Sequence, residues 1–254
     1  MWKYFLIAVS FFMSCSVDEL PPCDGIGVSG EICKEYQYVY GDFNGSNYYE
    51  YDLDSELVTR IVTKGKNGSE EGTTAYEYDS LQRVIGIALE DINGRVLTEK
   101  SFEFNEAGYL VKEIVEGQSN TTLDVIIEND LIIAEKFTEG SSIVWIDSLE
   151  YFLGTINLYR KIRFINSEIS QITYFEEYSN NVKEEKVTNS NGIIQSRRVM
   201  NFDGNDNMIE ELFYSGAGTL LKRTVYTYEG NLLDRVERYN ESGVEFERLE
   251  YQRF

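Results

Sequence analysis

Histidine is absent from all 254 residues of the chain. Its absence excludes Ser–His and Cys–His nucleophilic pairs, histidine-ligated zinc and the side chain that most often acts as a general base near neutral pH. Basic residues are also scarce, because 23 Lys and Arg stand against 44 Asp and Glu and give a formal net charge of −21. Such a charge argues against sequence-independent nucleic-acid binding and against adsorption to anionic lipid. We therefore expect no nucleic-acid partner, no cofactor and no bound metal.

The chain also lacks an apolar run long enough to span a bilayer. Its N-terminus has Lys3 and then a mostly apolar run, Tyr4–Met13, which is far shorter than the roughly 20 residues of a membrane-spanning helix but typical of a secretory signal. The following Phe12-Met13-Ser14-Cys15 resembles a bacterial lipoprotein box. That resemblance implies a signal peptide over 1–14 and a diacylated Cys15 at the mature N-terminus. The alternative is an ordinary cleaved signal with Cys15 unmodified.

Proline and cysteine are scarce as well, with two and three residues respectively. Both prolines, Pro21 and Pro22, lie in the segment 15–22, which we interpret as an extended lipidated tether. Cys23 and Cys33 are the thiols that remain for an oxidising compartment, so we predict a disulfide between them. A metal site is disfavoured, because two thiols without histidine do not supply four ligands.

Aromatic residues, in contrast, are abundant, with 19 Tyr and 14 Phe, and many of them follow a repeat. Its pattern is an aromatic residue, any residue, a second aromatic residue and Asp or Asn, followed by a turn and an apolar residue. From Phe202 the aromatic positions advance to Tyr251 in steps of 12, 14, 11 and 12 residues. The repeat anchors are Tyr49, Tyr51, Tyr76, Tyr78, Phe102, Phe104, Phe202, Tyr214, Tyr226, Tyr228 and Tyr239.

Each repeat unit predicts a strand, a turn and a strand. Residues i and i+2 of a strand share a face, aromatic residues favour strands, and Asp or Asn with a nearby Gly favours a turn. Steps of about 12 residues leave no room for parallel crossovers, so consecutive strands must pair antiparallel. We therefore predict one all-β domain over 23–254, an antiparallel meander of repeated hairpins with about sixteen strands. A sheet of this size should coil, split into two layers, or close into a shell or barrel.

Two copies of the repeat carry a family resemblance. Tyr76-Glu77-Tyr78-Asp79-Ser80-Leu81-Gln82-Arg83-Val84 and Phe102-Glu103-Phe104-Asn105-Glu106-Ala107-Gly108-Tyr109-Leu110 resemble the YD repeats of the RHS class, whose consensus is Tyr-x-Tyr-Asp-x-x-Gly-Arg-Leu. The likeness covers about 36–115 and 171–254, and the segment between them keeps β-rich stretches without the motif. The consensus arginine after the turn glycine survives only as Arg95. The resemblance implies a β scaffold in an envelope setting and leaves the ligand open.

Two kinds of candidate chemistry remain. Adjacent acids such as Glu184-Glu185 and Glu210-Glu211 point to opposite faces of a strand, so a glycosidase would need two carboxylates from different strands. The segment 203–207, Asp-Gly-Asn-Asp-Asn, begins like a calcium loop but lacks the later glycine and glutamate of an EF-hand, which favours a simple turn. For the paired aromatic anchors, burial in a core is the favoured interpretation over an exposed row that stacks on a ligand.

Together these features favour a non-enzymatic envelope lipoprotein that is anchored to the membrane, expected to be the outer membrane, facing either the surface or the periplasm. Its β scaffold would bind a protein or glycan partner. Two alternatives stay open. The first is an immunity or regulatory module, which the kinship with RHS toxin systems implies. The second is a carboxylate-dependent glycoside hydrolase.

Overall fold

The computed structural model describes residues 23, 28–179 and 181–254. The predicted signal peptide and tether, and with them Cys15, lie outside these residues. The described chain consists of strands and turns only, as the repeat predicts. The strands are β1 (Ile32–Val39), β2 (Asp42–Asp52), β3 (Leu57–Gly65), β4 (Glu70–Tyr78), β5 (Val84–Asp91), β6 (Val96–Phe104), β7 (Leu110–Glu116), β8 (Thr121–Glu128), β9 (Leu131–Glu139), β10 (Ser142–Tyr151), β11 (Leu158–Ile165), β12 (Glu168–Ser179), β13 (Val182–Asn189), β14 (Ile194–Phe202), β15 (Met208–Ser215), β16 (Leu220–Glu229), β17 (Leu232–Asn240) and β18 (Glu245–Arg253).

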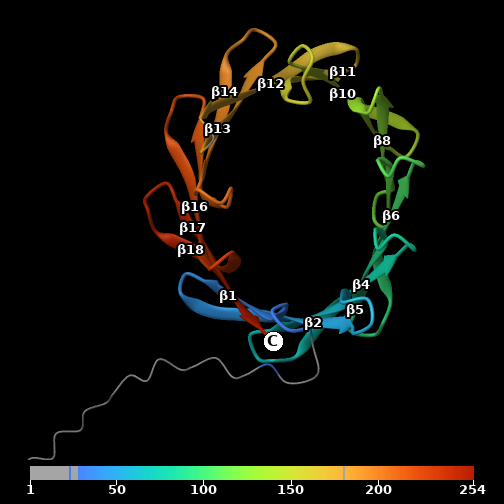
Figure 1. Cartoon of the computed structure of the whole chain (residues 1–254), viewed down its shortest axis with the longest axis vertical. Helices are drawn as coiled ribbons and strands as arrows, with labels where there is room; N and C mark the ends of the chain where they lie inside the picture. The colour runs from blue at the N-terminus through green and yellow to red at the C-terminus, as the bar shows by residue number, and fades with distance from the viewer. Residues whose placement is uncertain (1–22, 24–27, 180) are drawn as a thin grey trace, which may run out of the picture.

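The 18 strands form one sheet in which every strand pairs antiparallel with its neighbours in sequence. β1 also pairs with β18, so the sheet closes on itself into a barrel (Figure 1). The predicted antiparallel meander is confirmed, with two strands more than the spacing suggested, and of the three alternatives for so large a sheet the structure shows closure into a barrel. The segment without the motif contributes four regular strands, β8 to β11.

The seam of the barrel lies where the two ends of the described chain meet. Beyond the β1–β18 ladder, the Phe254 N–H donates to the Glu31 carbonyl at 3.0 Å and the Gly30 N–H donates to the Phe254 carbonyl. A disulfide joins Cys23 to Cys33 of β1, and the Cys23 Sγ lies 3.1 Å from the Arg253 carbonyl oxygen. Residues on both sides of the seam are therefore tied together.

The two ends of the barrel differ in their turns. We call the end where β1 begins and β18 ends the terminal rim; the turns after even-numbered strands lie there. The turns after odd-numbered strands form the distal rim. The residues between strands at the terminal rim include seven acids, Asp54, Glu56, Asp79, Glu106, Asp130, Asp203 and Asp206, and one base, Arg83. Those at the distal rim include only the acid Glu241 and the bases Lys66 and Arg95.

The register sorts the strand side chains into two faces, because residues directly opposite each other in a ladder share a face. One face carries the successive partners Lys34, Tyr48, Val62, Thr73, Glu90 and Val96. The other face carries Tyr49 and Tyr76, with Ile61 and Ile87 opposite them. Both sets continue around the whole barrel.

The hand of the sheet decides which face lines the lumen. Along the first series, the residues move from the terminal rim at Lys34 to the distal rim at Val96. In β4, the residues of that series direct their backbone N–H and C=O groups toward β5. Asp79, which continues the series just after β4, shows this, because its N–H donates a hydrogen bond to the Arg83 carbonyl. With the fixed twist of β-sheets, this stagger puts the Lys34 series outside and the Tyr49 series inside. We call these the outer and inner faces.

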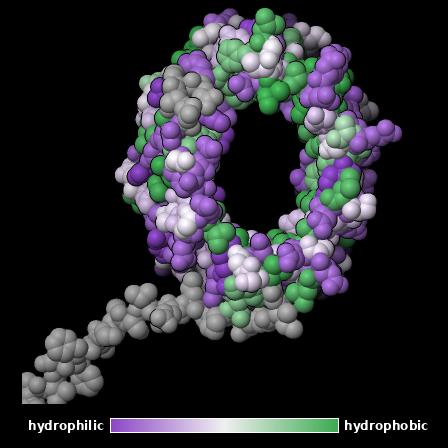
Figure 2. Space-filling view, viewed as in Figure 1, coloured by the Kyte–Doolittle hydropathy of each residue, from purple (hydrophilic) through white to green (hydrophobic). Residues whose placement is uncertain are grey.

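The lumen is open. A barrel of 18 strands is wide enough to leave an aqueous channel, and Figure 2 shows a hole passing through the molecule, with hydrophilic and hydrophobic residues intermixed on the face in view. Among the described residues, the buried apolar side chains are only Cys33, Tyr36, Val62, Ile162 and Val236. The expectation of a packed core is therefore wrong: a single closed sheet with an open channel leaves both faces in contact with water, and the repeat anchors are half-buried.

Candidate functional site

The inner face holds most of the predicted repeat anchors, and four tyrosines on it have one shared task. Each lies at the end of an even-numbered strand and donates its hydroxyl to a carbonyl at the start of the preceding strand. These bonds are Tyr51 to Ile32, Tyr78 to Val58, Tyr151 to Ile132 and Tyr228 to Met208, at 2.7–2.9 Å. The two strands are joined by a turn only at the distal rim, so the hydroxyl closes the open end of each hairpin.

Three other hairpins replace this tyrosine clasp with a cation. In the last hairpin, Arg253 donates to the Leu233 carbonyl at 2.7 Å, at the equivalent position. In two hairpins phenylalanine stands in place of tyrosine, and a cation at or just before the start of the hairpin's first strand covers its ring. Arg83 lies 4.3 Å from the centroid of Phe104, and Lys183 lies 5.3 Å from that of Phe202. The repeated aromatic position therefore has a structural function at the terminal rim.

The structure separates the predicted anchors into two groups. Nine of them lie on the inner face, whereas Tyr214 and Tyr239 lie on the outer face, where Arg197 and Arg223 cover their rings. The physical reason is that consecutive strands run in opposite directions. A step of about 12 residues reaches the next strand, but the equivalent position returns only after a whole hairpin, as the step from Tyr51 to Tyr78 shows.

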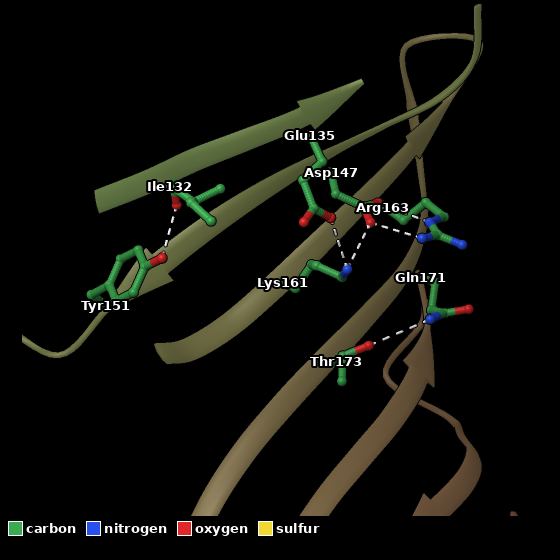
Figure 3. Close-up of polar contacts among 8 residues, drawn as sticks. All are labelled: Ile132, Glu135, Asp147, Tyr151, Lys161, Arg163, Gln171 and Thr173. Atoms are coloured by element: carbon green, nitrogen blue, oxygen red, sulfur yellow. Dashed lines mark hydrogen bonds and ion pairs between the residues drawn. The ribbon is translucent and has the colours of Figure 1, made fainter. Parts of the chain in front are cut away.

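Charged side chains form a network on the inner face of β9 to β11 (Figure 3). Asp147 is fully buried and accepts two hydrogen bonds from Arg163, at 2.7 and 2.8 Å. Lys161 lies between two carboxylates, 3.2 Å from Asp147 and 3.1 Å from Glu135. Arg163 also lies 4.1 Å from the Trp145 ring centroid. These groups balance one another's charge, since two acids face two bases.

Similar pairs occur elsewhere on the inner face, at Lys100–Glu113, at Glu185–Arg198–Glu211 and at Arg238–Glu247. Although burial opposes it, hydrogen bonds from Arg238 and Gln37 lower the pKa of Glu247 below its usual value. In these clusters a cation lies between or beside the carboxylates, as in Glu135–Lys161–Asp147. A general acid for glycoside hydrolysis instead needs a raised pKa. The carboxylates of these clusters are therefore placed as ion-pair partners.

The outer face is equally charged. Ion pairs link neighbouring strands around it at Asp124–Lys136, Glu150–Arg160, Glu176–Lys186 and Glu210–Arg223, at 2.7–3.2 Å. A membrane-spanning barrel presents an apolar band about 25 Å tall to the lipid, and a charge at its midplane costs about 2–4 kcal/mol. Charged pairs at mid-strand positions such as Lys136 and Lys186 are incompatible with such a band.

Tyrosines near the seam form a half-buried phenolic cluster on the inner face. Burial raises the pKa of Tyr49, and the Glu35 carboxylate and neighbouring tyrosines raise it further. Burial and Glu35 raise the pKa of Tyr251 to about 12. Glu35 also accepts a hydrogen bond from the Asn47 amide at 2.8 Å. These phenols stay neutral and available as hydrogen-bond donors at physiological pH.

The calcium-like segment forms a turn. The Asp203 carboxylate accepts hydrogen bonds from the Asn205 and Asn207 N–H groups at 2.8 and 2.9 Å, and these bonds, with the Asn207 side chain, lower the pKa of Asp203. Equivalent carboxylate-to-backbone bonds shape the turns at Asp79 and Asp91. Among the described residues no group of three His, Cys, Asp or Glu side chains is arranged to hold a metal ion.

Exposed aliphatic and aromatic side chains are spread around the distal rim. They occur at or beside six of its nine turns, and the most exposed are Tyr40, at 69%, Ile92, at 64%, and Ile193, at 61%. The remaining three of these six turns carry Ile143, Ile165 and Val244 at or beside them. We call these six residues the distal apolar ring. With only Lys66, Arg95 and Glu241 charged among the turn residues, this rim contrasts with the acidic terminal rim.

Comparisons with known proteins place the fold. No protein-family model and no curated protein matches the chain. A porin-like protein from Bacteroides uniformis superimposes on 92% of this chain and 100% of its own, with a TM-score of 0.51 and 9% sequence identity. The two chains share a fold. A porin-like protein from Bacteroides vulgatus matches 88% of this chain and 98% of its own, with a TM-score of 0.43 and 9% identity. A crystal structure of TcdB2-TccC3 without its hypervariable C-terminal region matches 80% of this chain and 13% of its own, with a TM-score of 0.42 and 12% identity.

Within the described residues, no helix is long and apolar enough to cross a membrane.

Two features of the site could not be predicted from the sequence. The network of Glu135, Asp147, Lys161 and Arg163 lies in the segment without the motif, and its members come from three strands, so no local spacing connects them. The only local signal is Lys161-x-Arg163, two cations on one face of a strand. The contrast between the rims was missed because it appears only when alternate turns are grouped together.

Proposed function

We propose that the chain is a non-enzymatic, lipid-anchored envelope barrel that stands in water and docks a protein partner on its distal rim. The observation that carries the proposal is that both faces of the barrel are charged while one end carries an apolar ring. Extended apolar patches at a protein surface mark interaction sites. The distal rim combines this apolar ring with turns that carry few charged residues.

The orientation follows from the position of the chain ends. Cys23, the first described residue, is joined by a disulfide to Cys33 at the start of β1, which lies at the terminal rim. A lipid on Cys15 would hold this acidic rim toward the membrane and leave the distal rim free to meet a partner. The porin-like proteins from Bacteroides are compatible with an envelope setting. The charged outer face supports a barrel that is tethered to the membrane without spanning it.

The anchoring step is tested with Cys15→Ser. We expect the wild-type chain to partition with membranes and the variant to stay in the aqueous fraction, as a folded β-protein without detergent. Far-ultraviolet circular dichroism and size-exclusion chromatography would follow the fold and the mass. A variant that still fractionates with membranes would contradict anchoring through Cys15, and a variant that folds only in detergent would contradict a barrel standing in water.

The docking step is tested with a photo-reactive residue at Ile193 on the distal rim and, as a matched control, at Leu81 on the terminal rim. Both positions are exposed aliphatic turn residues, at 61% and 69%. We expect cross-linking in intact cells to give one discrete protein adduct at Ile193, which is lost when Ile92 is changed to Glu, and no such adduct at Leu81. Equal adducts at both positions, or none at Ile193, would contradict docking on the distal rim.

A further inference from the structure

The turn between β10 and β11 is unlike the others at the terminal rim. It is the longest, with six residues from 152 to 157, and it contains no charged residue. Three of its apolar side chains are exposed: Phe152 at 50%, Ile156 at 81% and Leu153 at 102%. Five other turns at this rim contain Asp or Glu. The 152–157 turn is therefore an apolar tip on an acidic rim.

Hydrogen bonds inside the turn hold its shape. The Phe152 N–H donates to the Asn157 carbonyl and the Thr155 N–H donates to the Phe152 carbonyl, both at 3.0 Å. The Thr155 hydroxyl also donates to the Phe152 carbonyl, at 3.0 Å, and accepts a bond from the Asn157 N–H at 3.2 Å. The Phe152 ring packs against the Tyr159 ring, with the two centroids 5.0 Å apart. The tip therefore has a braced base, and because its hydroxyl already has partners, that group costs little to take out of water.

The turn lies across the ring from the seam (Figure 1). Ten strands, β1 to β10, separate it from the seam in one direction, and eight strands, β11 to β18, separate it in the other. Cys23 lies at the seam on the same rim. Eight residue steps lead from Cys15 to Cys23, so this segment spans at most about 26–29 Å. A lipid on Cys15 would therefore keep the terminal rim close to the bilayer.

The chemistry of this rim favours a lipid bilayer as the partner of the tip. The boundary between headgroups and acyl chains takes up apolar side chains without a complementary surface, and binding there scales with the apolar area that is buried. The 152–157 turn brings no charge into that region. The acids of the five other turns resist entering the bilayer, because charges inside it are costly. Insertion is therefore confined to the tip, and the acids of the rim stay in water.

From these observations we infer that the 152–157 turn inserts into the surface of the bilayer to which the chain is tethered. The inference rests on the lipid proposed at Cys15, which keeps the terminal rim near that bilayer. Leu153 and Ile156 lie among the acyl chains next to the headgroups, and Phe152 lies at the boundary. The lipid and the tip then hold opposite sides of one rim, so the barrel stands upright and its distal apolar ring faces away from the membrane.

The test places a polarity-sensitive dye at the tip. Leu153→Cys and, as a matched control on the distal rim, Ile193→Cys are each labelled with a nitrobenzoxadiazole maleimide on the lipidated chain and reconstituted into phosphatidylcholine vesicles. Cys23 and Cys33 form a disulfide and a lipidated Cys15 has no free thiol, so the wild-type chain should take up no dye. We expect a nitroxide on the lipid acyl chains to quench the dye at position 153 at least twofold and to leave the dye at position 193 unchanged.

A second change separates the tip from the lipid anchor. Ile156→Glu should abolish quenching at position 153 while the chain still floats with the vesicles, and Leu81→Glu, at an exposed position in another turn of the same rim, should leave quenching unchanged. Circular dichroism of each variant identifies a folding defect.

The outcomes distinguish this inference from the proposed anchoring. The inference is overturned, with lipid anchoring intact, if chains that float show no quenching at position 153 or equal quenching at positions 153 and 193. Loss of flotation in Ile156→Glu would support insertion of the tip and contradict anchoring through Cys15. A wild-type chain that takes up dye at Cys15 would contradict the lipid anchor, and the inference with it.

Discussion

At the scale of single residues, the repeated tyrosine is a clasp. A sealed core would make its ring the main source of stability, but the open lumen leaves the ring half-buried and gives the hydroxyl its defined role. The same position tolerates phenylalanine when a cation from the start of the hairpin lies over the ring, as Arg83 does over Phe104. The second aromatic residue of the repeat therefore helps to close a hairpin at the terminal rim, either through its hydroxyl or through its ring beneath a cation.

Tyr78→Phe isolates the contribution of the clasp. The change removes the 2.7 Å bond to the Val58 carbonyl and keeps the ring. A net hydrogen bond contributes about 0.5–1.5 kcal/mol, and water from the open lumen can solvate the freed carbonyl. We expect the free energy of unfolding in urea to fall by about 0.5–1 kcal/mol. Tyr109→Phe, at a more exposed turn position, should cost almost nothing, and equal costs for the two variants would contradict the clasp.

Asp147→Ala tests the charged network of the inner face. The variant leaves Arg163 and Lys161 without their buried partner, and breaking a buried pair on one side costs about 3–5 kcal/mol. Because both cations are about 30% exposed, water offsets part of this, and we expect a loss of about 2–3 kcal/mol in urea. Glu150→Ala, which removes an exposed outer-face pair with Arg160, should cost less than about 1 kcal/mol. A similar loss in both would show that burial does not set the cost.

At the scale of the elements, the spacing of aromatic residues predicted the strands well because the strand and turn periods are local. The β-rich run Ser142–Ile146 is part of β10 although it lacks the motif. The apolar pair Leu220-Leu221 coincides with a bulge, because Leu221 lies at the register shift between β15 and β16. What local spacing does not contain is the cross-strand register and the face on which each position lies, so it could not assign Tyr214 to the outer face or bring Glu135 to Lys161.

Two turn glycines offer a direct test of backbone conformation. Gly218 has a φ of +85° and Gly204 does not have a positive φ, and at neither would an added Cβ meet an atom within 4 Å. Alanine in the left-handed region costs about 1–2 kcal/mol, so Gly218→Ala should destabilise the barrel by that amount. Gly204→Ala should be neutral or slightly stabilising, because it reduces the freedom of the unfolded chain. Urea unfolding of both variants measures the difference, and equal losses would show that φ does not decide it.

At the scale of the whole molecule, the barrel is a ring one sheet thick, so its stability comes from closed ladders and cross-strand pairs. Closure leaves no exposed sheet edge. The same closure creates a lumen whose wall shelters phenol groups, and ten tyrosines have a pKa raised mainly by burial. Eight of them lie on the inner face. The shelter is a property of the intact ring and disappears when the ring opens.

Alkaline titration therefore reports on barrel closure. Since the folded barrel binds these phenolic protons more tightly than the unfolded chain, their contribution to stability is complete below pH 10, the ordinary phenol pKa, and is lost as the pH rises toward about 12, the pKa of Tyr251. We expect tyrosinate absorbance near 295 nm to rise in two stages, first for exposed phenols near pH 10 and then cooperatively with loss of the β signal in circular dichroism. In 6 M guanidinium chloride, used as the control, all tyrosines should titrate together near pH 10. Superimposable curves in buffer and denaturant would contradict a sheltered lumen, because they would mean that closing the barrel leaves its phenols as accessible to hydroxide as those of the unfolded chain.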